Sequence, residues 1–309
     1  MTKGKTLAQW WSTIRRNEYT TLYLFLLPAL VCLLIFSYIP MGGLVIAFQD
    51  FNIFKGIAGS EWVGLDNFRE AFTDPFFLRA LRNTLVINSY KLLYWIPLPL
   101  CMALMINELN FMPFRKTVQT VIYMPHFLSW VIVGGIFTQL LTVNGGAVNK
   151  ILANFGIQPV HFLTDANWFR ETIVWSSMWK EAGWGTIVYL AAITAVDPSL
   201  YEAATIDGAS KWRRIWTITV PSVSGTVVIV LMLSLGNLLG NSFEQILVMY
   251  NSIVYETADV IGTYTYRIGI GQMKYSYSAA IGMFNSVVGF TLVVTMNALT
   301  RKFLDRSIW

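Results

Sequence analysis

Six apolar runs, each long enough to cross a bilayer as a helix, determine what this chain can fold into. A hydrocarbon core of about 30 Å takes about 20 helical residues. Lipid offers the backbone no hydrogen-bond partners, so runs of this length must be helical. Apolar residues make up 55% of the chain and charged residues 13%, about half the charged share of a soluble protein. The sequence therefore predicts an all-α integral membrane protein with six transmembrane helices, over residues 19–49, 83–107, 117–141, 172–196, 218–243 and 279–300.

The distribution of charge predicts the orientation of these spans. With both termini in the cytoplasm, the inner segments hold twelve Lys or Arg against six acids, and the outer segments hold eight against ten. Basic residues favour the cytoplasmic side of a membrane protein. We therefore expect residues 1–18 to be a cytoplasmic tail, residues 19–309 to form the transmembrane domain, and the C-terminus to be cytoplasmic. The first run is too long for a cleaved signal peptide and lacks a small-residue cleavage site, so it is expected to remain as a span, bent near Pro28 and Pro40.

The inner segment between the fourth and fifth spans, residues 197–221, has the pattern of a helix, a tight turn and a second helix. Ser199 and Glu202 form an S-x-x-E capping box, and Asp197, followed by proline, gives a second signal for the start of a helix. Gly208 ends the helix, because glycine adopts the left-handed conformation at little cost. These features alone would suit a link between spans in any polytopic protein.

A longer pattern in the same segment resembles the EAA loop of ABC-importer permeases. Glu202-Ala203-Ala204 is followed after three residues by Gly208 and after nine more by Ile218-Thr219-Val220-Pro221. The family has leucine at the position of Val220, which is the sole departure. In that family the loop forms a coupling helix that docks into a groove on a cytoplasmic ATPase, which agrees with the orientation predicted from charge. The resemblance implies the type I ABC-importer permease fold and assigns ATPase coupling to Leu200, Tyr201, Glu202, Ala203, Ala204, Asp207 and Gly208.

Within this loop, apolar side chains are expected to carry the docking energy. Leu200, Tyr201, Ala204 and Ile206 cannot all face the spans above them, so some are available to the ATPase. Glu202 is expected to act first as a helix cap and only second as a partner of the ATPase.

The resemblance covers residues from about 22 to 309 and indicates a subgroup. ADVIGTYTYR at Ala258–Arg267, with YIPMGGLVIAFQDFN, GSEWVGLDNF and YMPHFLSW, is similar to permeases of carbohydrate (oligosaccharide) uptake importers. Membership implies a second, similar permease, two cytoplasmic ATPase subunits and an extracellular solute-binding protein, often a lipoprotein, in a bacterial cytoplasmic membrane. ATP and Mg would bind the ATPase subunits. No cofactor or metal is expected on this chain.

Polar and aromatic residues inside the predicted spans are candidates for a substrate path. A charge at the middle of a span costs about 2.5–3.5 kcal/mol on insertion scales, so Lys180 and Glu181 should face the bundle interior or a wet cavity. Lys91 is more readily interpreted as a lysine that snorkels to the outer headgroups. His126 is more often a helix–helix hydrogen bonder than a ligand, and Gly236 suits close packing. The candidate path residues are Tyr123, His126, Trp179, Lys180, Glu181, Trp184, Asn237, Asn241 and Glu244.

The sequence contains no enzyme signature. The two histidines, His126 and His161, fall in different predicted compartments, and there is no G-x-S-x-G, H-E-x-x-H or complete P-loop. Cys32 and Cys101 lie in separate apolar runs and indicate neither a disulfide framework nor a metal site. The inner loops account for the net charge of +5 without nucleic acid. The prediction is a permease subunit that takes up oligosaccharides delivered by a solute-binding protein. The alternatives are an ABC permease for a peptide or osmolyte, and a self-sufficient secondary transporter or channel, which would show inverted repeats.

Overall fold

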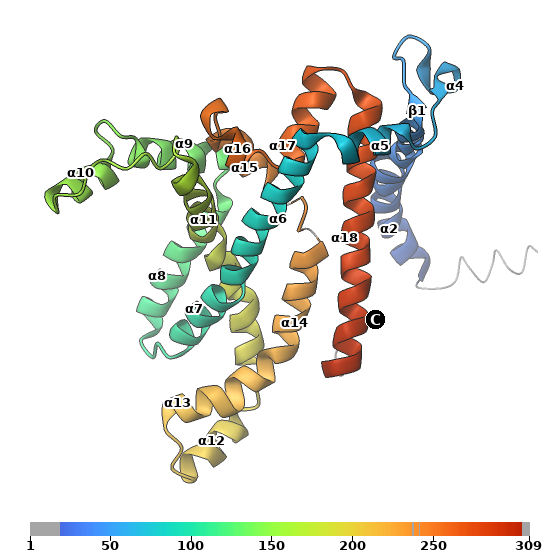
Figure 1. Ribbon diagram of the computed structural model, residues 1–309. Coiled ribbons are helices and arrows are strands. Elements are labelled where there is room, and N and C mark those ends of the chain that lie inside the picture. The colour runs from blue at the N-terminus through green and yellow to red at the C-terminus, as the bar shows by residue number, and fades with distance from the viewer. Residues whose placement is uncertain (1–18, 237, 241, 305–309) are drawn as a thin grey trace, which may run out of the picture.

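The computed structural model describes residues 19–236, 238–240 and 242–304, and nearly all of its regular structure is helical (Figure 1). The predicted tail, residues 1–18, lies outside the described residues. The first half contains α2 (Tyr19–Leu33), the π-turn η1 (Leu34–Tyr38), α3 (Ile39–Met41), the 3-10 helix η2 (Gly42–Phe48), β1 (Gln49–Asp50), α4 (Gly56–Gly59), β2 (Glu61–Trp62), α5 (Asp66–Thr73), α6 (Pro75–Trp95), α7 (Pro97–Asn107), α8 (Met112–Tyr123), η3 (Met124–Phe127), α9 (Trp130–Leu141) and α10 (Ala147–Asn154). The second half contains α11 (Ala166–Thr194), α12 (Pro198–Ile206), α13 (Lys211–Arg214), the π-turn η4 (Ile215–Thr219), α14 (Val220–Gly236), α15 (Phe243–Met249), η5 (Ser252–Val254), α16 (Tyr255–Ala258), α17 (Ile261–Tyr266), the π-turn η6 (Arg267–Gly271) and α18 (Tyr275–Leu304).

Four helical segments among the described residues are long and apolar enough to cross a membrane: Thr21–Phe48, Pro75–Asn107, Lys211–Gly236 and Tyr275–Lys302. They correspond to the first, second, fifth and sixth predicted spans. The fifth ends at Gly236 rather than at residue 243, and a separate helix, α15, begins at Phe243. The fourth predicted span lies within α11, a helix of 29 residues that also carries Arg170, Glu171, Lys180 and Glu181 and is therefore less apolar.

The third predicted span, residues 117–141, is not one continuous helix. α8 with η3 and the following α9 are bent by 102° relative to each other, which is the geometry of a broken span or of a re-entrant loop. Pro125 lies in the first turn of η3, and the Ser129 hydroxyl accepts a hydrogen bond from the Ile132 N–H, which starts α9 in a new direction. A capping serine directly after a proline-containing turn allows a helix to end and restart within an apolar run.

The helix α11 lies at the centre of the bundle and packs against α6, α7, α8 and α14. Phe169 and Ile173 pack against Ile87 and Ile246, and Tyr189, further along α11, packs in a second cluster with α7 and α14. Gly183 permits the approach of α8, because a Cβ there would lie 1.8 Å from the Ile122 carbonyl oxygen. This central position places the charged middle of α11 inside the bundle.

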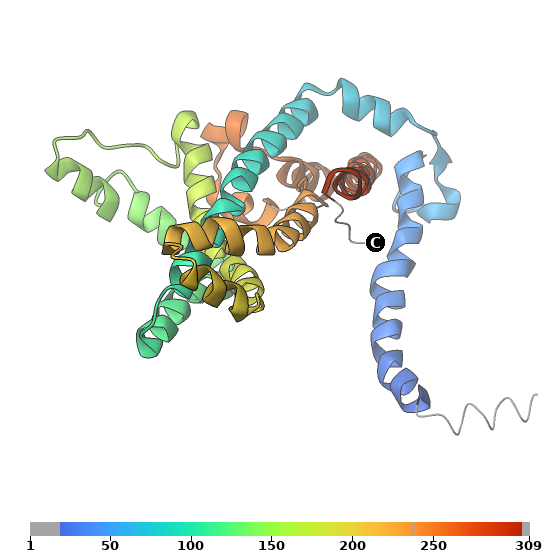
Figure 2. The ribbon, with the colours of Figure 1, turned by 90° about the horizontal axis from the view of Figure 1, so that it is seen from below.

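The first apolar segment stands apart from the rest of the bundle. Figure 2 shows α2 standing apart from the other helices, and its most apolar stretch buries none of its residues. Only the end of the segment, η2, packs against α18. The helix contains Pro28, and its hydrogen bonding changes to a π-turn before Pro40 and to a 3-10 helix after it. An apolar helix with all sides uncovered suits contact with lipid or with another membrane subunit.

The ADVIGTYTYR segment, Ala258–Arg267, connects α17 to α6 through hydrogen bonds. The carboxylate of Asp259, only 1% exposed, accepts hydrogen bonds from Arg267 Nη2 (2.5 Å) and from the Thr263 hydroxyl (2.8 Å). The Ile261 N–H donates to Thr84 Oγ1 of α6 at 2.8 Å. The hydrogen bond with Asp259 raises the pKa of Arg267, so the guanidinium stays charged at physiological pH. The motif therefore has a structural role at the end of the bundle opposite α12.

Replacing Tyr264 with Phe should destabilise the same end of the bundle. Asp74 caps α6, and its carboxylate accepts hydrogen bonds from the hydroxyls of Tyr264 and Tyr277. Burial opposes ionisation of Asp74, but the hydrogen bonds from Tyr264, the Phe76 N–H and Tyr277 hold its pKa below the usual value, so this stabilisation is present at neutral pH and is lost as the pH falls through the folded pKa. One hydrogen bond to a charged group is worth roughly 1.5–3 kcal/mol. Thermal unfolding in detergent should show this loss for Tyr264→Phe but not for the half-exposed Tyr266→Phe control.

Candidate functional site

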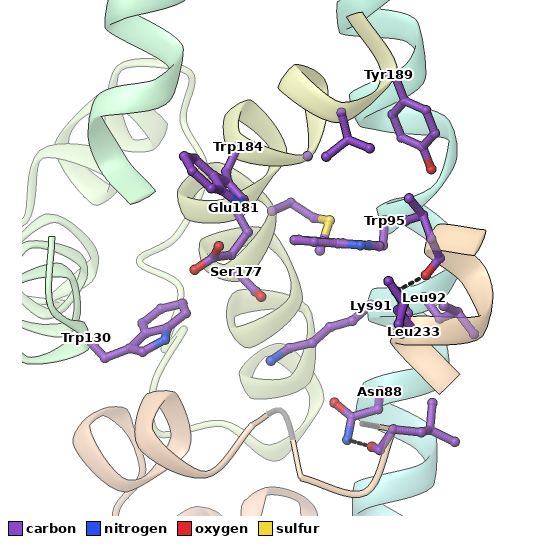
Figure 3. A pocket seen from close by; sticks show the side chains of 16 residues that line it. Asn88, Lys91, Leu92, Trp95, Trp130, Ser177, Glu181, Trp184, Tyr189 and Leu233 are labelled. Atoms are coloured by element: carbon purple, nitrogen blue, oxygen red, sulfur yellow. Dashed lines mark hydrogen bonds between the residues drawn. The ribbon is translucent and has the colours of Figure 1, made fainter. Parts of the chain in front are cut away.

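A cavity of about 440 Å³ lies between α6, α11 and α14, with one side chain contributed by α9 (Figure 3). Three tryptophans, Trp95, Trp130 and Trp184, line it together with polar and charged side chains. Its volume is typical of a small-molecule site. The full lining is Asn88, Lys91, Leu92, Trp95, Trp130, Ser177, Met178, Glu181, Trp184, Gly185, Val188, Tyr189, Val230, Leu233, Ser234 and Leu238.

Lys91 supplies an amine to this cavity. Lys91 is only 8% exposed, and its Nζ donates to Gln245 Oε1 at 2.6 Å and to Ser242 Oγ at 2.9 Å. Ser242 Oγ in turn donates to Asn88 Oδ1 at 2.6 Å. The interpretation of Lys91 as a snorkelling residue is therefore wrong, because the α14–α15 break brings two acceptors to it inside the bundle. Among the described residues, no carboxylate lies within ion-pair distance of its Nζ.

Glu181 forms the opposite polar wall and joins α11 to the break between α8 and α9. Its carboxylate contacts His126 Nδ1 at 2.7 Å and accepts a hydrogen bond from Lys180 Nζ at 2.8 Å. Lys180 also donates to the His126 carbonyl oxygen at 2.9 Å, and Trp184 stacks on the His126 ring at 4.5 Å between centroids. The expectations that Lys180 and Glu181 face the interior, and that His126 bonds between helices, are confirmed.

Three other predicted path residues do not belong to the lining of this cavity. Within the part of the chain that the structure describes, Tyr123, Trp179 and Glu244 are absent from the lining. Trp179 is 47% exposed and packs edge-on against Phe137, and Glu244 is exposed on α15. Asn237 and Asn241 lie outside the described residues. Contact of all these side chains with a substrate stays a prediction.

Sequence reasoning missed several lining residues that the structure brings together. Asn88 and Lys91 are three residues apart in an otherwise apolar run and therefore share one face of α6, which is a usable signal. Gln245 is 1% exposed, and its side-chain amide donates to Ile173 O (2.7 Å) and Ser176 Oγ (2.9 Å), so it fixes the position of the acceptor that Lys91 uses. Trp95 and Trp130 lie at helix ends, where their direction depends on tertiary packing.

The predicted coupling loop protrudes from one end of the bundle as α12 and α13 (Figure 1). Gly208 has φ +75°, and the Ala209 N–H bonds to the Ala204 carbonyl oxygen at 2.9 Å, which closes the helix as predicted. The predicted capping box of Ser199 and Glu202 is wrong. Asp197 is the N-cap, and its side chain accepts from the Ser199 N–H at 2.9 Å, because the proline at residue 198 favours a start two residues earlier.

Because Asp197 is the N-cap of α12, Glu202 has no capping role, and it is exposed. The Tyr201 side chain instead contacts another residue of the same loop. The Tyr201 hydroxyl lies 2.9 Å from Thr219 Oγ1, and Arg214 Nη1 donates to Thr205 Oγ1 at 2.7 Å. These bonds brace α12 against α13 and η4. The large apolar side chains left exposed on α12 are Leu200 (49%) and Ile206 (87%).

Replacing Gly208 with valine should misdirect α13 and weaken recruitment of a partner ATPase. Nothing lies within 4 Å of the position that a Cβ would take at Gly208, so the cost comes from the backbone, roughly 1–2 kcal/mol. Co-purification of the ATPase with the permease measures the effect. Gly156→Val is the matched control, because Gly156 has φ +74° and equally open surroundings far from α12. Equal recruitment in both variants would contradict a coupling role for the loop.

An apolar helical bundle that encloses a polar, tryptophan-lined cavity and presents a braced helix-turn-helix at one end is the architecture of a transport permease. Such a chain is a multi-pass membrane protein rather than an enzyme. The chain belongs to the family of binding-protein-dependent transport system inner membrane components, the permease subunits of ABC importers, whose model matches residues 95–305. The family predicted from the EAA-like loop is thereby confirmed.

Curated relatives and solved structures extend the similarity to nearly the whole chain. The chain is 46% identical over 296 residues to the polygalacturonan/rhamnogalacturonan transport system permease protein YteP of Bacillus subtilis (strain 168), covering 96% of this chain and 92% of the relative. It is 45% identical over 309 residues to protein LplB of the same organism, covering 100% of this chain and 96% of the relative. A bacterial ABC transporter involved in the import of the acidic polysaccharide alginate matches with TM-score 0.87 and 42% identity, over 96% of this chain and 99% of that one.

Proposed function

We propose that this chain is one of two permease subunits in an ATP-driven importer of oligosaccharides that carry uronate (sugar carboxylate) groups. It crosses the membrane six times, with α11 and the broken α8–α9 pair completing the four apolar spans, and both termini are cytoplasmic. The end of the bundle with α12 and α13 also bears Arg301 and Lys302, in the last turn of α18, and this clustering of basic residues supports its cytoplasmic placement (Figure 1).

The surfaces of the chain suit the remaining subunits of such an importer. The exposed α2 offers an apolar helix to a second permease or to lipid. At the cytoplasmic end, α12 presents Leu200 and Ile206 to a groove on one of two ATPase subunits, which would bind ATP and Mg. At the opposite end, an extracellular solute-binding protein would deliver the cargo. In a solved structure of a bacterial alginate ABC transporter, which matches this chain with 41% identity and TM-score 0.88, the transporter is in complex with an alginate pentasaccharide-bound periplasmic protein.

The position of Lys91 in the cavity carries the proposal for an acidic cargo. Tryptophan rings offer flat apolar faces on which sugar rings can stack, and Lys91 adds an amine with no carboxylate partner among the described residues. The neutral acceptors Ser242 and Gln245 hold its amine in the absence of cargo. A uronate carboxylate would form a stronger, charge-assisted hydrogen bond with the same amine. Relatives named for polygalacturonan/rhamnogalacturonan and alginate transport support the same class of cargo.

Uptake by the complete importer in proteoliposomes tests this function. The complex should accumulate oligogalacturonate when ATP and the solute-binding protein are both present, and take up the matched neutral galacto-oligosaccharide poorly. Preference for the neutral sugar would overturn the acidic cargo, and preference for a peptide or osmolyte would overturn the sugar. Accumulation without the ATPase subunits would identify a secondary transporter instead.

A further inference from the structure

Two exposed tryptophans and an arginine form a strip at the start of the helix that follows the coupling turn. Trp212 and Trp216 are 72% and 65% exposed and lie one helical turn apart, with Arg213 between them in sequence. Further along the same helix, Ile215 is half-buried and Thr219 is buried, and the Thr219 hydroxyl bonds with Tyr201 of α12. The strip is therefore a separate surface that the coupling contacts described above leave uncovered.

The position of this strip along the helix points to the membrane interface. Residues Lys211–Gly236 form a helical segment of 26 residues with the composition of a membrane span. At 1.5 Å per residue it is about 39 Å long, longer than a hydrocarbon core of about 30 Å. Its last residue, Gly236, lies close to the cavity level, so its first turns extend to the headgroup region. Tryptophan is enriched at that depth in membrane proteins.

The charge of the strip favours anionic lipid. Lys211 pairs with Glu108 at 3.2 Å and Arg214 donates to Thr205, so both are used within the protein. Across the residues that the structure describes, the guanidinium of Arg213 makes neither a hydrogen bond nor an ion pair, and it is exposed beside the two tryptophans. Cations next to an anionic leaflet are attracted to it.

We propose that Trp212, Arg213 and Trp216, at the start of this helix, bind anionic phospholipid headgroups of the cytoplasmic leaflet. This contact would fix the depth of the coupling loop in the membrane. The proposal rests on the cytoplasmic orientation of α12 given under the proposed function. The turn at Gly208 separates the two surfaces, so α12 meets the ATPase while this strip meets lipid.

Photo-crosslinking in the complete importer, in nanodiscs that contain phosphatidylglycerol, identifies what covers each surface. Benzoylphenylalanine in place of Trp212 should form an adduct with phospholipid. The same residue in place of Ile206 on α12 is the matched control and should form an adduct with the ATPase. An adduct of residue 212 with the ATPase or with the second permease would overturn the proposed contact with phospholipid. Failure of residue 206 to reach the ATPase, whatever residue 212 contacts, would overturn the proposed orientation instead.

A charge variant tests the anionic headgroup separately from the tryptophans. ATP hydrolysis by the complete importer is measured as phosphatidylglycerol replaces phosphatidylcholine in the nanodiscs. Arg213→Gln should need roughly fivefold more phosphatidylglycerol for half of the effect, which corresponds to about 1 kcal/mol per cation near such a surface. Lys150→Gln, an exposed cation on α10, is the control and should respond like the wild type. Identical lipid dependence of Arg213→Gln and the wild type would overturn the proposal.

Discussion

Lys91→Met should lower the efficiency of ATP-coupled uptake of oligogalacturonate by roughly tenfold to a hundredfold. A hydrogen bond to a charged group is worth roughly 1.5–3 kcal/mol, and each 1.4 kcal/mol corresponds to about a factor of ten. Methionine keeps the length of the apolar stem and removes the cation that Gln245 and Ser242 hold at 2.6 and 2.9 Å. The initial rate of uptake at low cargo concentration measures the loss.

Two comparisons separate recognition of the carboxylate from damage to the fold. Lys91→Arg keeps the charge and should retain much more uptake than Lys91→Met. A neutral galacto-oligosaccharide, taken up slowly by the wild type, should be affected little by either change. If Lys91→Met lowered uptake of neutral and acidic sugars by the same factor while the complex still assembled, the lysine would have a structural role rather than selecting the cargo.

The features that the sequence predicted correctly depend on the residues of one segment alone, without contacts from distant parts of the chain. Helical class follows from apolar length, and the left-handed turn at Gly208 follows from the backbone freedom of glycine, observed at φ +75°. The burial of Lys180 and Glu181 follows from the cost of a charge in lipid. Spacing would have improved one prediction, since Glu181 and Trp184 are three residues apart and share a helix face, whereas Trp179 points elsewhere. The structure places the first two at the cavity and the third against Phe137.

Features that depend on distant segments could not be predicted in this way. The direction of Lys91 depends on Ser242 and Gln245, which lie more than 150 residues further along the chain. The break after Phe127 replaces a continuous apolar pattern with a bend of 102°, and only packing against α15 shows where α9 goes. Two signals for the start of a helix overlap at α12: Asp197 followed by proline, and Ser199 with Glu202. Asp197 is the N-cap in the structure, so Glu202 has no capping role.

Replacing both Leu200 and Ile206 with serine should uncouple ATP hydrolysis from uptake and lower uptake at least tenfold. These side chains are 49% and 87% exposed on α12, so they are free to enter a groove on the ATPase. Transport and hydrolysis are measured together in proteoliposomes. Tyr201→Phe is the control for the loop itself, because it removes only the internal bond to Thr219. Glu202→Gln and Glu202→Ala should resemble each other, since Asp197 rather than Glu202 caps the helix.

The size of this expected effect follows from the energy that the interface must transmit. Moving a two-state transporter from 1:99 to 99:1 requires about 5.5 kcal/mol of differential contact energy. Burying one large apolar side chain is worth about 1.5–3 kcal/mol, so Leu200 and Ile206 together can supply most of it. An exposed ion pair through Glu202 contributes only about 0–1 kcal/mol. Wild-type coupling in the double serine variant, with the ATPase still bound, would show that polar contacts or another segment transmit the force.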